Sequence, residues 1–256
     1  MQPTGFLFDV DGVLTKPLTE TLRVSTPDPK VFALIRQLHG MGHAMSFVTG
    51  RAWPWFSNHI WPEVRQFTNP PPVFMEYGLV YFWRGELSLS SQGTVFRNET
   101  YPLLTQAFAH EAEERGIFFE PETPYANYPA HKSLWVEDKH AILSVAENTA
   151  VSKEQAHSLA DRLPPELLQQ VRVVKHHLGV DFLPQGWSKE QGARQALELL
   201  DPQRLVERWV VFGDNPSDRE MCLAFEEATF VDTKAHASED TIAWLEKYIG
   251  NLNLSC

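Results

Sequence analysis

Four aspartates, arranged in two pairs, have the spacing of groups that bind a metal ion and act on a phosphate. Asp9 and Asp11 flank Val10, so both carboxylates can point to one side of the chain while the valine points into the protein. Asp214 and Asp218 form a second pair near the other end of the sequence. Carboxylates this close repel unless a cation joins them, and Mg²⁺, which prefers oxygen ligands, would also neutralise a phosphate. A lone Asp-x-Asp is more often a capped turn, so the position of each pair in the fold decides whether a metal site is the better interpretation.

A hydroxyl group and several backbone N–H groups follow a buried run in the first half of the chain. Thr49, Gly50 and Arg51 end the apolar run 44–48 and open a predicted helix. The free N–H groups and the dipole of a helix N-terminus bind phosphate readily. Most Thr-Gly pairs are simply caps or turns, so this segment alone indicates little.

A lysine stands at a helix start where the helix dipole disfavours it. Ser188, Glu190 and Gln191 surround Lys189 in a capping box that opens a helix predicted to reach Leu200. A cation in the first turn opposes the helix dipole. Lys189 therefore requires either a compensating anion or exposure to solvent, and solvent exposure is the commoner state of an isolated lysine.

The second aspartate pair belongs to a strand end and the helix start that follows it. The apolar run 210–212 leads into the sequence GDNPSD, in which Asn215 can cap a helix and Pro216 suits its first position. Capping alone would explain Asp218. It does not explain Asp214 at the end of a buried strand, a position that fits a metal ligand.

These four segments stand where an open α/β sheet binds its ligands. Short apolar runs alternate with amphipathic helices, which predicts βαβ units and a parallel sheet; the runs are 6–8, 44–48, 73–75 and 210–212, and a clear helix is 29–39, capped by Asp28. Ligand sites in such sheets lie outside the carboxyl ends of the strands. The sequence therefore predicts that the four segments share one site.

The middle of the chain has a different pattern, in which neighbouring strands form antiparallel hairpins. The predicted strand pairs are 133–137 with 140–146 and 171–177 with 180–183, and the predicted helices are 102–115 and 152–163. We expect an inserted α+β domain at residues 84–184, within an α/β core formed by residues 1–83 and 185–256.

Composition narrows the class of protein. The 256 residues are 43% hydrophobic and 21% charged, as in an ordinary globular protein. The formal net charge of −11 argues against nucleic acid or an anionic membrane as a partner. Two cysteines, Cys222 and Cys256, exclude a disulfide framework or a cysteine zinc site. With no signal-peptide pattern and no membrane-length apolar run, we expect a cytoplasmic protein; the oligomeric state is not indicated.

Taken in order, four segments resemble the motifs of the haloacid dehalogenase-like hydrolase superfamily: FLFDVDGV, SFVTGR, the lysine of GWSKEQG, and VVFGDNPSD. The 140 positions from Thr49 to Lys189 resemble the branch with a large α/β cap between motifs II and III. The segment VDFLPQGWSK is similar to that of sucrose-phosphate phosphatases, mannosyl-phosphoglycerate phosphatases and phosphomannomutases. The expected fold is α/β, with a Rossmann-like parallel-sheet core and an inserted α+β cap domain.

The resemblance implies a role for each motif residue. Asp9 would attack phosphorus and form an aspartyl-phosphate, while Asp11 would protonate the leaving alcohol and later activate water. Mg²⁺ would be held by Asp9, the backbone carbonyl of Asp11, and Asp214. The phosphoryl group would be stabilised by Thr49, Gly50 and Lys189. Asp218 and Asn215 would contact these groups and not the substrate, and Asp218 would orient Lys189 or metal-bound water.

The expected substrate is a small phosphorylated metabolite, a sugar or polyol phosphate, held between core and cap. Its recognition is expected from basic side chains, of which the candidates are Arg51, Arg97, Lys132 and His176. The cap residues among them are expected on hairpins. Pocket shape depends on the cap, whose sequence beyond these stretches resembles nothing that identifies a substrate.

The expected activity is that of a Mg²⁺-dependent phosphatase, with two alternatives left open. Thr49-Gly50-Arg51 resembles the phosphatase form of motif II, but FDVDGVLTKP is close to phosphomannomutases, so a phosphohexomutase remains an alternative. Ser217 replaces the asparagine common in motif IV of phosphatases with this cap, which puts a phosphate contact there in doubt. A non-catalytic phosphate-binding protein is a third hypothesis, which the complete set of motif residues disfavours.

Overall fold

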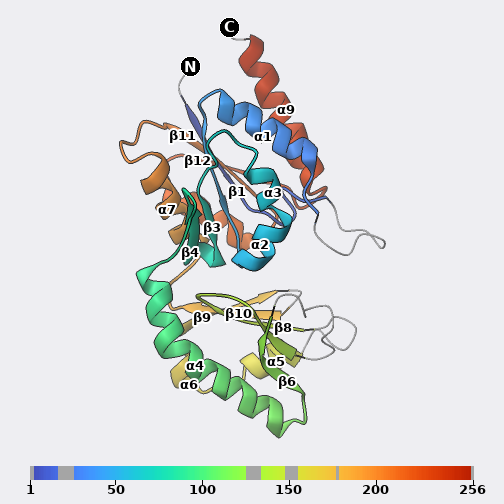
Figure 1. Ribbon diagram of the computed structural model, residues 1–256, viewed down its shortest axis with the longest axis vertical. Helices are drawn as coiled ribbons and strands as arrows, with labels where there is room; N and C mark the ends of the chain where they lie inside the picture. Colours follow the sequence, from blue (N-terminus) through green and yellow to red (C-terminus); the bar gives the residue numbers. More distant parts are fainter. Residues whose placement is uncertain (1–2, 17–25, 125–133, 148–154, 177–178, 255–256) are drawn as a thin grey trace. The chain divides into compact units, whose positions relative to one another are not determined.

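The chain divides into two compact units. The computed structural model describes residues 3–16, 26–124, 134–147, 155–176 and 179–254 (Figure 1). Unit 1 contains residues 1–51, 56–87 and 188–256, and unit 2 contains residues 52–55 and 88–187. Within the described residues, none of the helices combines the length and the apolar character that a membrane span requires.

Unit 1 is built on a seven-stranded sheet with the order β12-β11-β1-β2-β3-β4-β5. The first five strands in that order are parallel, and β3 pairs with β4 antiparallel. Figure 1 shows the blue β1 beside the orange β11, so both ends of the sequence build the centre of the sheet. The strands are β1 (Thr4–Phe8), β2 (Ala44–Val48), β3 (Val73–Met75), β4 (Val80–Trp83), β5 (Glu86–Leu89), β11 (Arg208–Gly213) and β12 (Ala228–Asp232).

Helices pack on both faces of this sheet because its strands are apolar on both sides. On one face Leu7 and Val48 join the buried cluster of α7 (Lys189–Leu200). On the other face Phe6 contacts Trp244 of α9 (Ser238–Leu254). The remaining helical elements of this part are α1 (Pro29–Gly40), α2 (Trp53–His59), α3 (Trp61–Val64), η1 (Glu76–Gly78), α8 (Pro216–Arg219) and η3 (Glu220–Ala224).

Unit 2 has a five-stranded sheet with the order β6-β7-β8-β10-β9. The neighbours β7, β8, β10 and β9 pair antiparallel, whereas β6 joins β7 in parallel. Its strands are β6 (Phe119–Thr123), β7 (Leu134–Glu137), β8 (Leu143–Ala146), β9 (Val171–His176) and β10 (Gly179–Pro184), and its helices are α4 (Ser91–Glu114), α5 (Gln155–Ala160) and α6 (Pro165–Leu168). The predicted fold class, a parallel-sheet core with an inserted α+β domain, is confirmed.

One predicted element boundary is wrong by three turns. The helix expected to begin near residue 102 begins at Ser91, and Pro102 lies inside it. Ser90 caps this start, because its Oγ accepts a hydrogen bond from the N–H of Gly93 at 3.0 Å. A proline signal near a helix start is therefore misleading here, since α4 accommodates Pro102 in its interior.

Candidate active site

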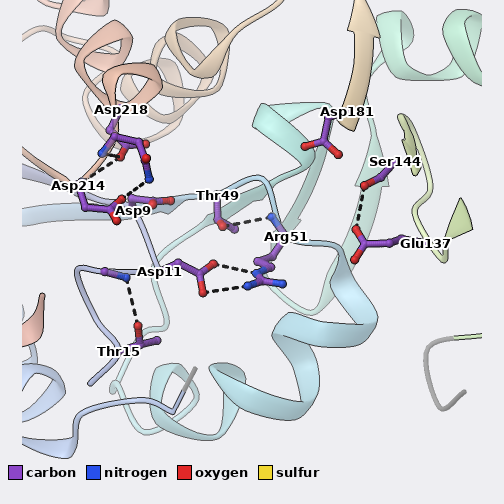
Figure 2. A network of polar contacts seen from close by, with 12 residues as sticks. Asp9, Asp11, Thr15, Thr49, Arg51, Glu137, Ser144, Asp181, Asp214 and Asp218 are labelled. Carbon is purple, nitrogen blue, oxygen red and sulfur yellow. Dashed lines mark hydrogen bonds and ion pairs between the residues drawn. The ribbon is translucent and has the colours of Figure 1, made fainter. Parts of the chain in front are cut away.

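The carboxyl ends of three neighbouring strands of unit 1 bring the predicted motif residues together. Asp9 directly follows β1, Thr49 follows β2 and Asp214 follows β11. Lys189 begins α7. The backbone continues the sheet into this site, since Asp9 N–H donates to the carbonyl of Phe212 at 3.0 Å. Figure 2 shows the aspartates of both motif pairs with Thr49 and Arg51 in one network.

Lys189 lies between two buried carboxylates. Its Nζ donates to Asp9 Oδ1 at 2.7 Å and to Asp218 Oδ1 at 2.6 Å. The lysine is only 5% exposed, so solvent does not explain its place in the first helical turn. Burial opposes its charge, but Asp218 and Asp9 together raise the pKa of Lys189 above its ordinary value. Asp9 and Asp218 are therefore the compensating anions that a buried lysine in the first helical turn requires.

The helix start after β11 fixes Asp218. Its Oδ2 accepts hydrogen bonds from the N–H groups of Asp214 at 3.0 Å and Asn215 at 2.8 Å. Asn215 is the N-cap and Pro216 opens the helix, as predicted. Asp218 thus has two roles that sequence alone left as alternatives: one oxygen caps the helix and the other pairs with Lys189.

Three carboxylates of this site form an acidic cluster suited to a cation. One oxygen each from Asp9, Asp214 and Asp218 lies within 4.8 Å of the others. Burial and the charge of Asp218 raise the pKa of Asp214 to about 6, although Lys189 opposes them. Burial and Asp218 likewise raise the pKa of Asp9 well above its ordinary value. The hard oxygen donors and the excess of negative charge fit Mg²⁺.

The loop after β1 approaches Asp214 closely. Gly12 has a φ of +69°, and a Cβ built on it would collide with Oδ2 of Asp214. Thr233 Oγ1 donates to the carbonyl of Gly12 at 2.7 Å and holds this loop from the end of β12. A glycine is required at this position on both counts, conformation and space.

Asp11 is held by an arginine. Arg51 Nε lies 2.8 Å from Asp11 Oδ2, and Arg51 Nη2 lies 3.1 Å from Oδ1, which is a two-point ion pair (Figure 2). The structure places Arg51 on Asp11, and its contact with substrate stays a prediction. The carboxylate of Asp11 is thus oriented by Arg51, while the acidic cluster is formed by the other three aspartates.

The segment after β2 is braced by the buried turn 76–78, which follows β3. Thr49 is 1% exposed, and its Oγ1 accepts the N–H of Arg51 at 3.2 Å. The carbonyl of Thr49 accepts the N–H of Tyr77, and the carbonyl of Arg51 accepts the N–H of Glu76. Glu76 and Tyr77 both have left-handed φ, at 49° and 61°. Local backbone strain at such a site is consistent with a turn that positions a binding loop.

Two of the three predicted substrate residues of the cap lie in the part of the chain that the structure describes. Arg97 lies on α4 rather than on a hairpin, with its guanidinium 3.7 Å from the centre of the Tyr101 ring, because α4 begins earlier than expected. His176 ends β9, and its Nε2 lies 3.6 Å from Asp181 Oδ1. Lys132 falls outside the described residues.

Unit 2 carries a buried polar cluster, formed by Glu137, Lys139, Ser144 and Asp181. Lys139 Nζ lies 3.2 Å from both Glu137 Oε2 and Asp181 Oδ1. Ser144 Oγ donates to Glu137 Oε2 at 2.9 Å (Figure 2). Ser144 is fully buried, and Asp181 and Lys139 are 3% and 8% exposed.

This polar cluster lies on the sheet face opposite the helices. Alternate residues such as Val136, Val145 and Val180 belong to the apolar cluster shared with α4 and α5, so the intervening side chains point the other way. Glu137, Ser144 and Asp181 alternate with these apolar residues on β7, β8 and β10, and Lys139 follows β7. That alternation is the sequence signal that could have identified them, since a polar residue buried within an apolar strand is unusual.

Comparison with known proteins identifies the fold. No model of a protein family matches the sequence, and no curated protein matches it. A HAD/COF-like hydrolase from Plasmodium vivax is 16% identical, with 98% of this chain and 96% of that chain covered and a TM-score of 0.63. The trehalose-6-phosphate phosphatase of Aspergillus fumigatus is 17% identical, with 100% and 94% covered and a TM-score of 0.57. A haloacid dehalogenase-like hydrolase from Bacteroides thetaiotaomicron is 14% identical, with 96% and 100% covered and a TM-score of 0.60.

These structures share their fold with nearly the whole chain, including the insertion. The resemblance indicated by the four motifs is therefore confirmed at the level of the fold, which is that of the haloacid dehalogenase-like hydrolases.

Proposed function

We propose that this protein is a Mg²⁺-dependent phosphatase that hydrolyses a small phosphorylated metabolite through an aspartyl-phosphate on Asp9. The observation that carries the proposal is the buried Lys189 between Asp9 and Asp218, beside the carboxylate of Asp214. Burying a lysine among three carboxylates costs desolvation free energy, and a role in binding or catalysis would explain why the protein retains this arrangement. A cation beside a nucleophilic carboxylate is what an attack on a negatively charged phosphate requires.

Each group of the site has a place in the reaction. A carboxylate oxygen of Asp9 bonds to phosphorus as the bond from phosphorus to the alcohol oxygen breaks. In that step Asp11, protonated on one oxygen while Arg51 holds the other, gives its proton to the alcohol oxygen. Asp11 then takes a proton from the water that hydrolyses the aspartyl-phosphate. Lys189 and the Thr49-Gly50 segment stabilise the charge on the phosphoryl group. Mg²⁺, held by Asp9, Asp214 and the backbone carbonyl of Asp11, would supply further positive charge there.

The polar cluster of unit 2 supports a sugar or polyol phosphate as the substrate. The carboxylates of Glu137 and Asp181 accept hydrogen bonds, and hydroxyl groups donate them. Two carboxylates share the single cation of Lys139, so the cluster keeps one excess negative charge, which suits the hydroxyl groups of a polyol better than a second phosphate. The trehalose-6-phosphate phosphatases among the structural neighbours act on a phosphorylated sugar, in agreement with this substrate class.

A panel of phosphorylated metabolites, assayed for phosphate release with Mg²⁺ and with EDTA, tests the activity. We expect Mg²⁺-dependent release from one or a few sugar phosphates. Asp9→Asn should lower the rate by about 10³-fold or more, because the nucleophile is lost, without loss of the folded state.

Asp232→Asn is the matched control for this experiment. Asp232 ends the neighbouring strand β12 as an exposed carboxylate paired with Arg219, so its replacement should leave the rate unchanged. Near-normal turnover by Asp9→Asn would refute the nucleophile. Negligible release from every compound would favour a phosphate-binding protein, and conversion of a sugar phosphate to its isomer would favour the mutase.

A further inference from the structure

An aromatic ring packs against the segment 49–51 of the proposed phosphate site. A Cβ built on Gly50 would lie 3.3 Å from both Cε2 and Cζ of Tyr77 and 3.4 Å from its Oη, which is closer than carbon atoms pack comfortably. Gly50 has no left-handed φ, so its backbone conformation does not require a glycine. The space that the ring of Tyr77 occupies is therefore the reason for a glycine at position 50.

Tyr77 has a backbone conformation that a large side chain rarely adopts. Its φ of 61° and ψ of 25° lie in the left-handed region, where glycine or asparagine causes less strain. Such strain persists only where the surrounding structure fixes it, and it is concentrated at binding and catalytic sites. The tyrosine is 7% exposed, so its strained backbone is offset by contacts of its ring, of which Gly50 provides one.

The turn that carries this ring is held from two sides. On one side the N–H of Tyr77 donates to the carbonyl of Thr49 at 3.0 Å. On the other side the turn packs on α7, because a Cβ at Gly78 would collide with the backbone of Gly192. The same helix begins with Lys189. The ring therefore stands on a rigid support between the segment 49–51 and the helix that carries the buried lysine.

Gly50 needs such a support more than its neighbours do. A glycine has more accessible backbone conformations than any other residue, and a ligand that binds its N–H must restrict them unless the protein has already done so. The peptide groups on both sides of Gly50 are held, since the carbonyl of Thr49 accepts the N–H of Tyr77 and the N–H of Arg51 donates to Thr49 Oγ1 at 3.2 Å (Figure 2). The ring of Tyr77 restricts the Cα between them.

We propose that Tyr77 is a positioning residue for the phosphoryl group, whose ring fixes Gly50 so that the backbone N–H there is preset for binding. This inference rests on the proposed function, because the segment 49–51 is the proposed contact with the phosphoryl group. Tyr77 acts through Gly50 and not on the reacting atoms. Its loss should therefore weaken phosphate binding and raise KM, whereas kcat should change little.

Calorimetric titration of the full-length protein with inorganic phosphate, in the presence of Mg²⁺, tests the proposal beside steady-state kinetics. Tyr77→Leu keeps a bulky apolar side chain at the same backbone conformation but has no flat ring. We expect it to raise the Kd for phosphate and the KM for the best substrate of the panel by about tenfold, with kcat within about threefold. Tyr77→Phe keeps the ring, so the Kd should rise by less than about threefold.

Gly50→Ala tests the same contact from its other side. In the wild-type background the new methyl group meets the ring, and the Kd for phosphate should rise by about tenfold. In the Tyr77→Leu background the flexible leucine makes room, so the further rise should be less than about threefold. Effects that simply multiply would show that the contact between the two residues is not their cause.

Tyr81→Leu is the control for the loss of an aromatic ring. Tyr81 is half-buried on β4, and its ring stacks on Phe74 with centres 6.0 Å apart, so its replacement removes similar packing within the same unit. The melting temperature of each variant reports its stability, and Tyr81→Leu should leave the Kd for phosphate unchanged. Equal losses of affinity in Tyr77→Leu and Tyr81→Leu, or no loss in either, would overturn the positioning role and leave the phosphatase proposal standing. A wild-type protein that binds no phosphate would overturn both.

Discussion

At the scale of single residues, the site depends on charges that hold one another in place. Lys189 is shared by Asp9 and Asp218, and Asp11 is held by Arg51. Each carboxylate of the first motif therefore has its own cation. This separates the two aspartates chemically, because the proposed nucleophile is buried against a lysine while the proposed acid and base is half-exposed against an arginine.

Arg51 should act as a positioning residue for Asp11. Arg51→Lys keeps the charge but cannot form the two-point contact, so Asp11 loses its fixed orientation. We expect kcat to fall by about 10- to 100-fold with little change in KM or in the Mg²⁺ requirement. Steady-state kinetics on the best substrate of the panel measures this.

Arg36→Lys provides the comparison for that variant. Arg36 forms a similarly half-buried ion pair with Glu63, at 3.1 Å, within the same unit. Its replacement should leave kcat unchanged. If both variants lose activity equally, or if neither does, Arg51 does not position Asp11.

At the scale of elements, one close helix contact and one sheet register position the polar side chains. The first joins α7 to η1, where Gly192 packs against Gly78. This contact sets the depth of the helix whose first residue is Lys189. The second is the sheet register in unit 2, which aligns Glu137, Ser144 and Asp181 on one face.

Gly192→Ala should displace α7. A Cβ at Gly192 would lie 3.0 Å from Val48 Cγ1 and 3.1 Å from the carbonyl of Tyr77, both of which belong to the site's scaffold. We expect a loss of about 1–3 kcal/mol in the free energy of unfolding and a lower kcat. Urea denaturation and kinetics measure the two effects. Gly250→Ala in α9 meets nothing within 4 Å, so it should be neutral or stabilising by about 0.5–1 kcal/mol; equal effects of the two substitutions would contradict the explanation.

The buried ion pair of unit 2 should make stability depend on pH. Burial would raise the pKa of Asp181, but Lys139 and His176 outweigh it and hold that pKa well below its ordinary value. A carboxyl with a lowered pKa stabilises the fold above its unfolded pKa of about 4, and this contribution is lost as the pH falls through the folded pKa. Asp181→Asn should therefore cost about 3 kcal/mol at pH 7 and progressively less below pH 4.

Urea denaturation at pH 7 and pH 3 measures this difference between wild type and variant. The control is Asp161→Asn, which removes an exposed ion pair with Lys175 and should cost less than about 1 kcal/mol at either pH. A cost for Asp181→Asn that does not change with pH would show that the ion pair is not its cause.

At the scale of the whole molecule, part of the negative charge of the chain is concentrated at one site. Of the 33 acidic residues, three are gathered in the acidic cluster of unit 1, where two have raised pKa values. The folded protein therefore holds repulsion that a divalent cation would relieve.

Mg²⁺ should stabilise the folded protein through the acidic cluster. A ligand that binds the folded state at about 100 times its Kd adds about 2.7 kcal/mol, which for a chain of this size corresponds to about 5 °C or more in Tm. Differential scanning calorimetry with Mg²⁺ and with EDTA measures the shift. Asp214→Asn should abolish it and Asp232→Asn should retain it, whereas an unchanged Tm in the wild-type protein would argue against a metal site in the acidic cluster.

Local patterns in the sequence predict where the strands and helices of the site begin and end. Strand ends at Asp9, Thr49 and Asp214 follow from short apolar runs, and the helix start at Lys189 follows from its capping box. These signals extend over a few residues, so a single sequence contains them whole. The order of the four motifs was enough to predict the fold class with its insertion.

Which charges meet depends on the tertiary structure. Lys189 and Asp9 are 180 positions apart, and no local signal states that the lysine is buried between two carboxylates. Arg51 pairs with Asp11, which lies 40 positions away, and Arg97 lies on a helix in place of the hairpin that the sequence predicts. Side-chain pairing depends on sheet order and on the approach of α7, and these result from long-range packing, which periodicity along the chain does not encode.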